Sequence, residues 1–365
     1  MRALLIGGTA ASGRCIVSEL QKRNYEVAIY HRGTHEADLP PDVQHIHGDP
    51  HFRESIERDF EGKTWDVVIA TYGRLQLLAD AVRGKTGRFL SVGGFAVMKG
   101  WMRVRDEHWW EHAGPVPLPG REDDPLEDPG VDHFVDRMIE TERAVMANHA
   151  AGEYVASHFR YASVYGPYSI FPFEWKTIRR ILDGRRQIII QDGGQHLFTR
   201  CAAPNAAHAI GLAIDRPEAS AGQIYNVGDD RQFTHRQWLE LLASAMDYEF
   251  EFVDIPYSVA PPGYSAVAPL VGGRYHRWLD TSKAKVQLGY TDVVRPEDWV
   301  RESVQWSLAS QATGTPIRDM EGGPDYPAED RLIAAWQDML KLMPAEIGER
   351  LTYRHPYDHP KAAQA

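Results

Sequence analysis

The residues best suited to bind a ligand lie at the start of the chain, where Gly7, Gly8 and Gly13 follow a short apolar segment. Residues 3–6 have the composition of a buried strand, and the spacing of Ile16 and Leu20 indicates a helix that opens after Gly13. The N-terminus of a helix carries unpaired N–H groups and the positive end of the helix dipole, so this turn is suited to a pyrophosphate. The predicted phosphate-contacting residues are Gly7, Gly8, Thr9, Ala10, Ala11, Ser12 and Gly13.

Strand-like and helix-like patterns alternate over the first 160 residues. The expected strands are Arg2–Ile6, Tyr25–Tyr30, Val43–His47, Asp66–Thr71, Arg88–Val92 and Tyr154–Tyr161, and the expected helices are Arg14–Arg23, His51–Phe60, Leu75–Val82 and Val135–His149. Such alternation is typical of parallel strands joined by crossover helices and predicts an α/β fold with a doubly wound parallel sheet. A later strand, Gln223–Val227, precedes a helix that Thr234 is expected to cap.

The pattern suggests a dinucleotide-binding domain over residues 1–164, to which strand 223–228 and helix 234–246 return. Residues 165–222 and 247–352 are less regular and are interpreted as a smaller C-terminal substrate lobe, followed by a tail over 353–365. Residues 113–130 are rich in glycine, proline and acidic side chains, and with Trp109 and Trp110 beside them they suggest a lid over the site.

Composition excludes several classes of protein. The net charge of −11 and the sequence pI near 5.8 argue against a nucleic-acid partner, which needs a basic surface. Two cysteines provide neither a disulfide framework nor a zinc pattern, so we expect a cytoplasmic protein whose site holds no metal. No apolar segment is long enough to cross a membrane, and we expect no membrane partner.

Six segments in a fixed order resemble the extended short-chain dehydrogenase/reductase family, in its NAD(P)-dependent epimerase/dehydratase branch. They are Ile6–Gly13 with alanine at the middle glycine, Gly48–Pro50, Arg88–Ser91, Arg160–Pro167 (Arg-Tyr-Ala-Ser-Val-Tyr-Gly-Pro), Ile224–Gly228 and Leu279–Ala284, the last followed by Leu288-Gly289. The resemblance covers about residues 1–310 and implies a Rossmann-type sheet, a small-molecule substrate and a homodimer. It further implies that Asp49 accepts a hydrogen bond from adenine, and it assigns cofactor contacts to Pro50, Ala70, Thr71, Ser91, Ala162 and Val164.

The end of the second strand predicts which dinucleotide binds. A carboxylate there holds a free ribose 2′-hydroxyl, whereas a 2′-phosphate needs a cation. This chain has Tyr30-His31-Arg32 and no carboxylate, so His31 and Arg32 favour NADP(H), with NAD(H) as the alternative.

Family members that transfer hydride carry Tyr-x-x-x-Lys on the helix after strand five. That helix here reads Asp132-His-Phe-Val-Asp-Arg-Met, so the pair becomes His133/Arg137 in one register or Phe134/Met138 in the other. His133 and Arg137 could replace the pair, because imidazole titrates near neutral pH and a guanidinium holds an anion. The helper serine of the family falls on Ser91 or on Gly93, and Tyr72 or Tyr165 could supply the proton instead. Lys99, Glu107 and His108 are weaker candidates for that role.

The substrate region lacks the Arg-Asp pair of relatives that handle sugar nucleotides, although Arg200 lies in the corresponding segment. This difference disfavours a substrate with a diphosphate. Aromatic residues suit a ring-containing or apolar ligand instead. The expected substrate-binding residues are Trp101, Tyr165, Trp175 and Arg200.

Three functions are consistent with these features. The leading interpretation is an NADP(H)-dependent oxidoreductase that acts on a small non-nucleotide carbonyl or hydroxyl compound. The second is an epimerase, isomerase or dehydratase that keeps its dinucleotide bound. The third is a non-catalytic dinucleotide-binding regulator, which the missing Tyr-x-x-x-Lys pair keeps open.

Overall fold

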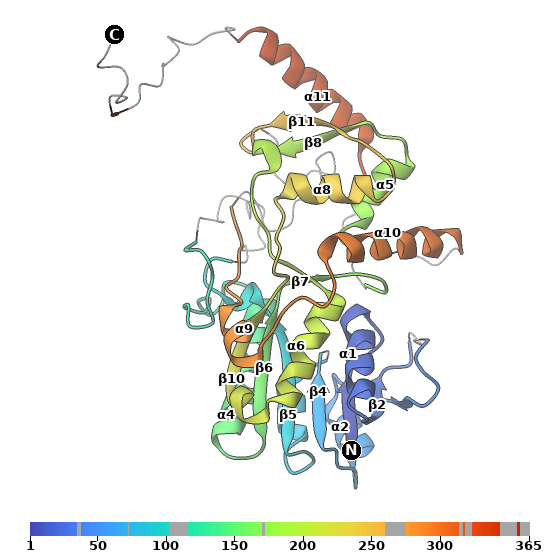
Figure 1. Cartoon of the computed structure of the whole chain (residues 1–365), viewed down its shortest axis with the longest axis vertical. Helices are drawn as coiled ribbons and strands as arrows, with labels where there is room; N and C mark the ends of the chain where they lie inside the picture. Colours follow the sequence, from blue (N-terminus) through green and yellow to red (C-terminus); the bar gives the residue numbers. More distant parts are fainter. Residues whose placement is uncertain are drawn as a thin grey trace, which may run out of the picture.

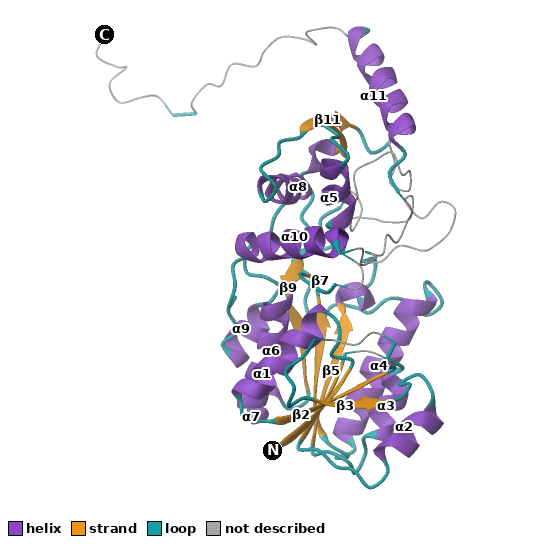
Figure 2. Cartoon of the chain, turned by 90° about the vertical axis from the view of Figure 1, so that its right-hand side faces the viewer, coloured by secondary structure: helices purple, strands orange, loops and turns teal. Residues whose placement is uncertain are grey.

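The computed structural model describes residues 1–34, 38–71, 73–101, 116–169, 172–259, 275–313, 317, 323–343 and 356–357. Within these residues the centre of the fold is a seven-stranded sheet in the order β10-β6-β5-β4-β1-β2-β3 (Figures 1 and 2). Its strands are β1 (Arg2–Ile6), β2 (Glu26–His31), β3 (Gln44–His47), β4 (Val67–Ala70), β5 (Arg88–Gly94), β6 (Val155–Tyr161) and β10 (Gln223–Val227). Every neighbouring pair is parallel, which confirms the doubly wound sheet expected from the sequence.

Helices cover both faces of this sheet. One face packs against α1 (Ala11–Lys22), α6 (Ala203–Asp215) and α9 (Ser282–Leu288), and the other against α2 (Arg53–Phe60), α3 (Leu75–Ala81) and α4 (His133–Ala150). Side chains of β1 alternate between the two layers, with Ala3 and Leu5 in the first and Leu4 and Ile6 in the second. Because both faces are covered, β1 is apolar throughout its buried length, as buried parallel strands are.

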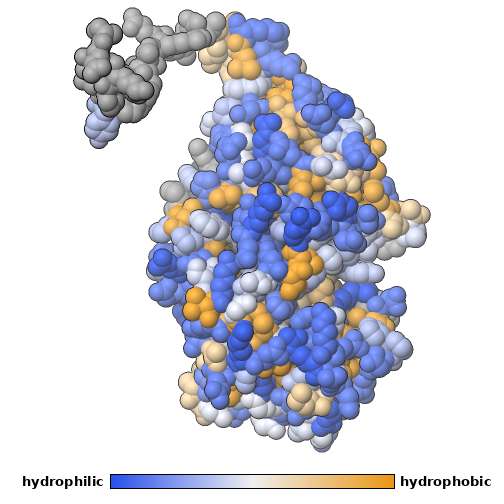
Figure 3. Space-filling view, in the orientation of Figure 1, coloured by the Kyte–Doolittle hydropathy of each residue, from blue (hydrophilic) through white to orange (hydrophobic). Residues whose placement is uncertain are grey.

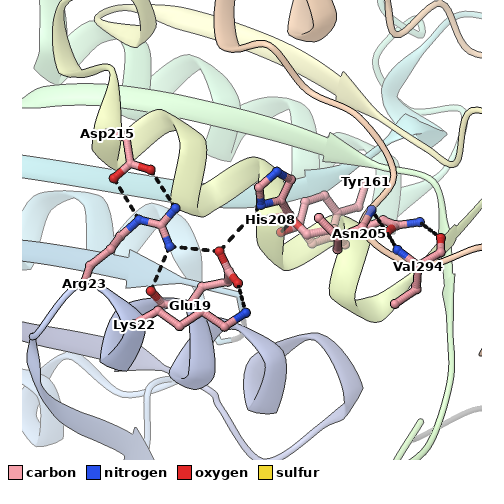
Figure 4. A network of polar contacts seen from close by, with 10 residues as sticks. Glu19, Lys22, Arg23, Tyr161, Asn205, His208, Asp215 and Val294 are labelled. Carbon is pink, nitrogen blue, oxygen red and sulfur yellow. Dashed lines mark hydrogen bonds and ion pairs between the residues drawn. The ribbon is translucent and has the colours of Figure 1, made fainter.

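Polar contacts join α1 to α6 (Figure 4). Arg23 forms ion pairs with Asp215 at 2.6 Å and with Glu19 at 2.8 Å, and His208 Nδ1 lies 3.6 Å from a Glu19 oxygen. The hydrogen bonds that Arg23 donates to Asp215 raise the pKa of Arg23, and burial only partly offsets this effect. These contacts hold α6 beside the helix that follows the glycine turn.

The smaller lobe lies beyond the carboxyl ends of the sheet strands (Figure 1). It contains α5 (Trp175–Leu182), α8 (His235–Ser244), α10 (Pro296–Ala312), α11 (Tyr326–Lys341) and a two-stranded parallel sheet of β8 (Gln187–Gln191) and β11 (Glu251–Ile255). The short parallel strands β7 (Ser163–Tyr165) and β9 (Arg200–Ala202) connect the lobe to the main sheet. The remaining short elements are η1 (Phe95–Val97), η2 (Asp192–Gly194) and α7 (Pro217–Ser220).

Two helices lie in different parts of the fold from those expected. The segment 165–222 was assigned to the lobe, but its alanine-rich helix α6 packs on α1 and on the main sheet. Helix α8 was expected with the sheet, but its Trp238, Leu239 and Leu242 pack among lobe residues. The N-cap of α8 is confirmed: Thr234 Oγ1 accepts from the N–H of Gln237, and the Gln237 side chain accepts from the N–H of Thr234.

Among the described residues, no helix is both long and apolar enough to cross a membrane. The face drawn in Figure 3 is mostly hydrophilic, with small separate hydrophobic patches.

Candidate functional site

The glycine turn follows β1, the strand from which the chain builds the sheet outward in both directions. Strands β2 and β4 lie on either side of β1, so the loops after β1 and β4 diverge at their carboxyl ends. Such a switch point is where open α/β sheets bind ligands. Thr71, which follows β4, donates from its N–H and its hydroxyl to the Ile6 carbonyl at 3.0 and 3.2 Å and so holds the two strand ends together.

The turn itself fits a pyrophosphate. Gly7 and Gly8 have φ values of +108° and +94°, a region that side chains other than glycine rarely adopt. A Cβ on Gly13 would lie 2.4 Å from the Gly8 Cα, so only glycine lets α1 pack this closely on the turn. The N-cap residue Ala10 provides no side-chain cap, which leaves the first N–H groups of α1 without a side-chain acceptor. An anion at this position would satisfy them.

The expected adenosine-binding residues lie along the ends of β2 and β3. Arg32 is exposed directly after β2, and His31 is buried with 4% of its surface exposed. The Asp49 carboxylate accepts from the N–H and Nδ1 of His51 at 2.9 and 2.8 Å, and in this way caps its own turn. Desolvation opposes ionisation of Asp49, but these hydrogen bonds and the charge of Arg32 lower its pKa overall. Pro50 is buried and packs near Gly73.

Beside the carboxyl end of β5, α4 presents Met138 at the position where the sequence predicts the proton-transferring pair. A Cβ on Gly94, the last residue of β5, would lie 3.1 Å from Met138 Cε. The register Phe134/Met138 therefore lies nearest the end of β5, and Phe134 is 55% exposed. His133 is also exposed, and Arg137 forms a surface ion pair with Glu140 at 3.0 Å. The sequence of α4 contains neither tyrosine nor lysine.

Ser91 lies in the interior of the sheet. Its Oγ shares a 2.7 Å hydrogen bond with His158 Nδ1, and the other ring nitrogen lies 3.5 Å from Glu142. Glu142 in turn accepts two hydrogen bonds from Arg160, both at 2.8 Å. Burial lowers the pKa of His158 to about 4, so the imidazole is neutral at physiological pH. This serine–histidine–glutamate–arginine network is sealed from solvent and ties α4 to β5 and β6.

A pocket in the lobe is lined in part by β7, the short strand that directly follows β6 at the carboxyl end of the main sheet. Its floor holds two opposite charges, Glu174 at the start of α5 and Arg200 on β9, with 3% and 7% of their surfaces exposed. No ion pair within 4.0 Å joins these two described side chains. The residues lining the pocket are Ser163, Tyr165, Phe173, Glu174, Thr177, Arg200, His235, Trp238 and Leu239.

The charged groups of the pocket titrate abnormally because they are buried. Burial raises the pKa of Glu174 to about 7, although the nearby Arg200 opposes this change. Burial likewise lowers the pKa of Arg200 to about 10. The Arg200 guanidinium carbon lies 4.3 Å from the centre of the Trp238 ring, and one of its nitrogens donates to the Phe198 carbonyl at 3.1 Å.

His235 adds an unsatisfied polar group to this pocket. Its ring is 2% exposed, and neither ring nitrogen has a hydrogen-bond partner. A buried polar group without a partner costs free energy, which a water molecule or ligand in the pocket would recover. Burial lowers the pKa of His235 well below its usual value, so the ring acts as a neutral donor or acceptor.

The other predicted site residues are held in the surrounding core. Tyr165 lines the pocket, but its hydroxyl donates to Asp229 at 3.0 Å, and burial raises its pKa well above 10. Trp101 packs against Phe95, and Trp175 is the first residue of α5. Ala70, Thr71, Ala162 and Val164 lie at or just after the carboxyl ends of β4 and β6, around the crevice. Tyr72, Glu107, His108, Trp109 and Trp110 fall outside the described residues.

Sequence reasoning missed Glu174 and His235. The signal for Glu174 was a single carboxylate inside Phe171-Pro-Phe-Glu-Trp175, an aromatic segment where burial would perturb its titration. His235 gave no signal, because it directly follows the cap of an ordinary amphipathic helix.

Comparisons with known proteins agree with this geometry. No family model matches the chain. A dTDP-glucose 4,6-dehydratase of Streptomyces antibioticus is 25% identical over 170 residues, which are 46% of each protein, so the match spans about half the length of that relative.

Solved structures match over a greater length. A UDP-glucose 4-epimerase of Thermotoga maritima, solved with UDP-glucose, superposes with a TM-score of 0.66 at 18% identity, over 85% of this chain and 100% of its own. The dTDP-glucose 4,6-dehydratase DesIV of Streptomyces venezuelae, solved with NAD, gives a TM-score of 0.63 at 19% identity, over 87% and 100%. This chain therefore has the fold of these solved structures, and the order of its sequence motifs resembles that of the NAD(P)-dependent epimerase/dehydratase family of extended short-chain dehydrogenases/reductases.

Proposed function

We propose that this protein is an enzyme of the epimerase or dehydratase type that keeps a nicotinamide dinucleotide bound while it transforms a hydroxylated, sugar-type substrate. The observation that carries the proposal is the pocket of Glu174 and Arg200, which is also lined by Ser163 and Tyr165 of β7, the strand that follows β6 at the carboxyl end of the main sheet. The similar proteins that were solved with UDP-glucose or with NAD support this function over net oxidation of a non-nucleotide compound.

The dinucleotide would lie with its pyrophosphate at the glycine turn and its adenosine toward Arg32 and Asp49. NADP(H) is the proposed form, because Arg32 follows β2 and residues 30–32 supply no carboxylate to repel a 2′-phosphate. Two of the similar structures contain NAD, so a preference for NADP(H) at Arg32 would distinguish this chain from them.

The pocket is suited to hydroxyl groups. Arg200 and the ionised form of Glu174 compensate each other's charge, so the pocket favours neutral ligands that both donate and accept hydrogen bonds. Sugar nucleotides are the first compounds to test, even though the chain lacks the Arg-Asp pair of relatives that bind them.

The bound dinucleotide would supply reversible hydride transfer at its nicotinamide ring. The residues of this chain must then hold the substrate and move a proton. Glu174 is the proposed proton-transferring group, because burial brings its pKa to about 7, where a carboxyl both accepts and releases a proton near neutral pH. Arg200 and His235 would orient the reacting hydroxyl.

The test combines cofactor analysis with turnover. The purified protein is denatured, the released dinucleotide is identified by chromatography, and fresh protein is incubated with UDP-glucose or dTDP-glucose. We expect a bound dinucleotide and a changed sugar without net change in nicotinamide absorbance. Stoichiometric oxidation of added NADPH with a carbonyl substrate would instead favour the net oxidoreductase.

Glu174→Gln separates catalysis from binding. The variant should retain the dinucleotide but lose turnover, and the inflection of the rate profile near pH 7 should vanish. Arg179→Gln, at an exposed position of α5, is the matched control and should retain that inflection. Wild-type turnover in Glu174→Gln would remove the carboxyl from this role.

One observation favours a second candidate, a dinucleotide-binding protein without turnover. Met138, a side chain that cannot transfer protons, occupies the position beside Gly94. This candidate predicts tight dinucleotide binding together with unchanged substrate in every turnover assay.

A further inference from the structure

Three histidines come together where β2 and β3 end. His31 is the last residue of β2, and His45 and His47 occupy alternate positions of β3. In the parallel register His31 lies opposite His47. Alternate residues of one strand point to the same face of a sheet, so all three rings belong to one face, next to the edge strand β3.

The ring nitrogens are close enough to share one ion. Each histidine offers a nitrogen that lies within 4.8 Å of the nitrogens offered by the other two. His31 Nε2 lies 3.1 Å from His45 Nδ1. Zinc–nitrogen bonds of about 2.0–2.1 Å in a tetrahedral site place two ligand nitrogens about 3.3 Å apart, so one pair already has this spacing and the third ring needs only a small shift.

We infer that His31, His45 and His47 form a binding site for a divalent transition-metal ion of the Zn²⁺ type. Neutral imidazoles are good ligands for Zn²⁺, Ni²⁺ and Cu²⁺, and three of them leave one coordination position for water or an exogenous ligand. The ion can reach the site because His47 is exposed, while the buried His31 anchors it. The site lies at the end of β2 predicted to face the adenosine, apart from the pocket of Glu174 and Arg200, and the inference does not depend on the proposed function.

Metal binding also changes a proton position that can be observed. His31 Nδ1 accepts from the Gly33 N–H at 3.2 Å, so the neutral ring carries its proton on Nε2, toward His45. Coordination through Nε2 transfers that proton to Nδ1, and the Gly33 N–H must then find another acceptor. Metal binding therefore changes the hydrogen bonding of the Gly33 N–H, which directly follows Arg32 in the chain.

The sequence alone did not reveal this site. The motif His45-Ile-His47 is short, and His31 precedes it by a loop, so the three residues become neighbours only through the pairing of β2 with β3. The spacing of the two cysteines carries no signal for a site built from histidines alone.

The test is a titration of the full chain, freed of any affinity tag and stripped with EDTA. Zn²⁺ is added in competition with a chromophoric chelator, and Co²⁺ is added separately to record its visible absorption. We expect one ion per chain, a tetrahedral Co²⁺ spectrum, and a shift of the Gly33 amide resonance. His47→Gln should weaken Zn²⁺ binding by at least about 10-fold, whereas His133→Gln, which replaces an exposed histidine of α4, should leave it unchanged.

His47 is at the surface, so loss of folding does not complicate this variant, and a thermal melt without metal checks that it matches the wild type. Wild-type affinity in both His47→Gln and His45→Gln, or the absence of stoichiometric binding in the wild type, would overturn the inference. The three rings would then be a packing cluster, consistent with their edge-on ring contacts.

Discussion

Gly13 of α1 lies directly against Gly8 of the preceding turn, so closely that a Cβ on Gly13 would be 2.4 Å from the Gly8 Cα. This contact fixes the distance between the helix N-terminus and the end of β1, and with it the width of the pyrophosphate site. Because the obstructing atoms are backbone, no side-chain rotation can relieve an added methyl group.

Gly13→Ala should therefore displace α1, destabilise the fold by about 1–3 kcal/mol and weaken dinucleotide binding. Urea unfolding and fluorescence titration with NADPH measure the two effects. Gly87→Ala is the matched control, since a Cβ there meets nothing within 4 Å. Equal affinity in Gly13→Ala and the wild type would mean that the dinucleotide binds elsewhere.

Glu174 should make stability depend on pH. Burial raises its pKa to about 7 in the folded state, above the value of 4.5 expected when unfolded. The folded protein thus binds this proton more tightly, so the contribution of Glu174 is most favourable below about pH 4.5 and is lost as the pH rises through 7. The loss amounts to about 3 kcal/mol.

Urea unfolding at pH 5 and pH 8 checks this dependence. The wild type should lose more stability over this interval than Glu174→Gln, whereas Glu57→Gln, at an exposed position, should follow the wild type. Parallel pH curves for Glu174→Gln and the wild type would show that Glu174 is not buried as described.

The buried network around His158 should be essential for folding. Arg160→Met would leave the carboxylate of Glu142 buried without its counter-charge, at a cost of about 3–5 kcal/mol. Chemical denaturation measures this loss.

Arg137→Met is the control for that experiment, because it breaks the exposed pair with Glu140 on the same helix. Such pairs contribute about 1 kcal/mol or less.

Arg137→Met and His133→Ala also test whether these two side chains transfer the proton. Because the side chains of His133 and Arg137 are both exposed, we expect each variant to turn over substrate at the wild-type rate. Loss of turnover in both variants would instead identify the two residues as the proton-transferring pair.

Arg32→Ala should weaken binding of NADPH about 10- to 100-fold, because a charge-assisted hydrogen bond to the 2′-phosphate would be lost. Affinity for NADH should hardly change, since NADH lacks this phosphate. Parallel titrations of both nucleotides measure the ratio, with Arg53→Ala as the nearby surface control. A proportional loss for both nucleotides would place Arg32 outside the 2′-phosphate site.

The order of motifs in the sequence was sufficient to predict the sheet and the glycine turn, because strand composition and glycine conformation are local properties. The placement of α6 and α8 was not predictable in this way. Helix α6 is mostly apolar and α8 is amphipathic, and their partners, α1 for α6 and α5 and α10 for α8, are determined by tertiary packing. The pocket of Glu174 and Arg200 and the cluster of His31, His45 and His47 each combine residues from separate elements. Neither arrangement could be predicted before strand pairing was known.

Isothermal titration of the wild-type chain with NADPH and with NADH tests the central claim most directly, once any dinucleotide carried through purification has been removed. Our account predicts one site per chain, tighter binding of NADPH, and a crystal structure of that complex with the pyrophosphate at residues 7–13. No heat with either nucleotide, together with an empty crevice in crystals grown in excess dinucleotide, would contradict it.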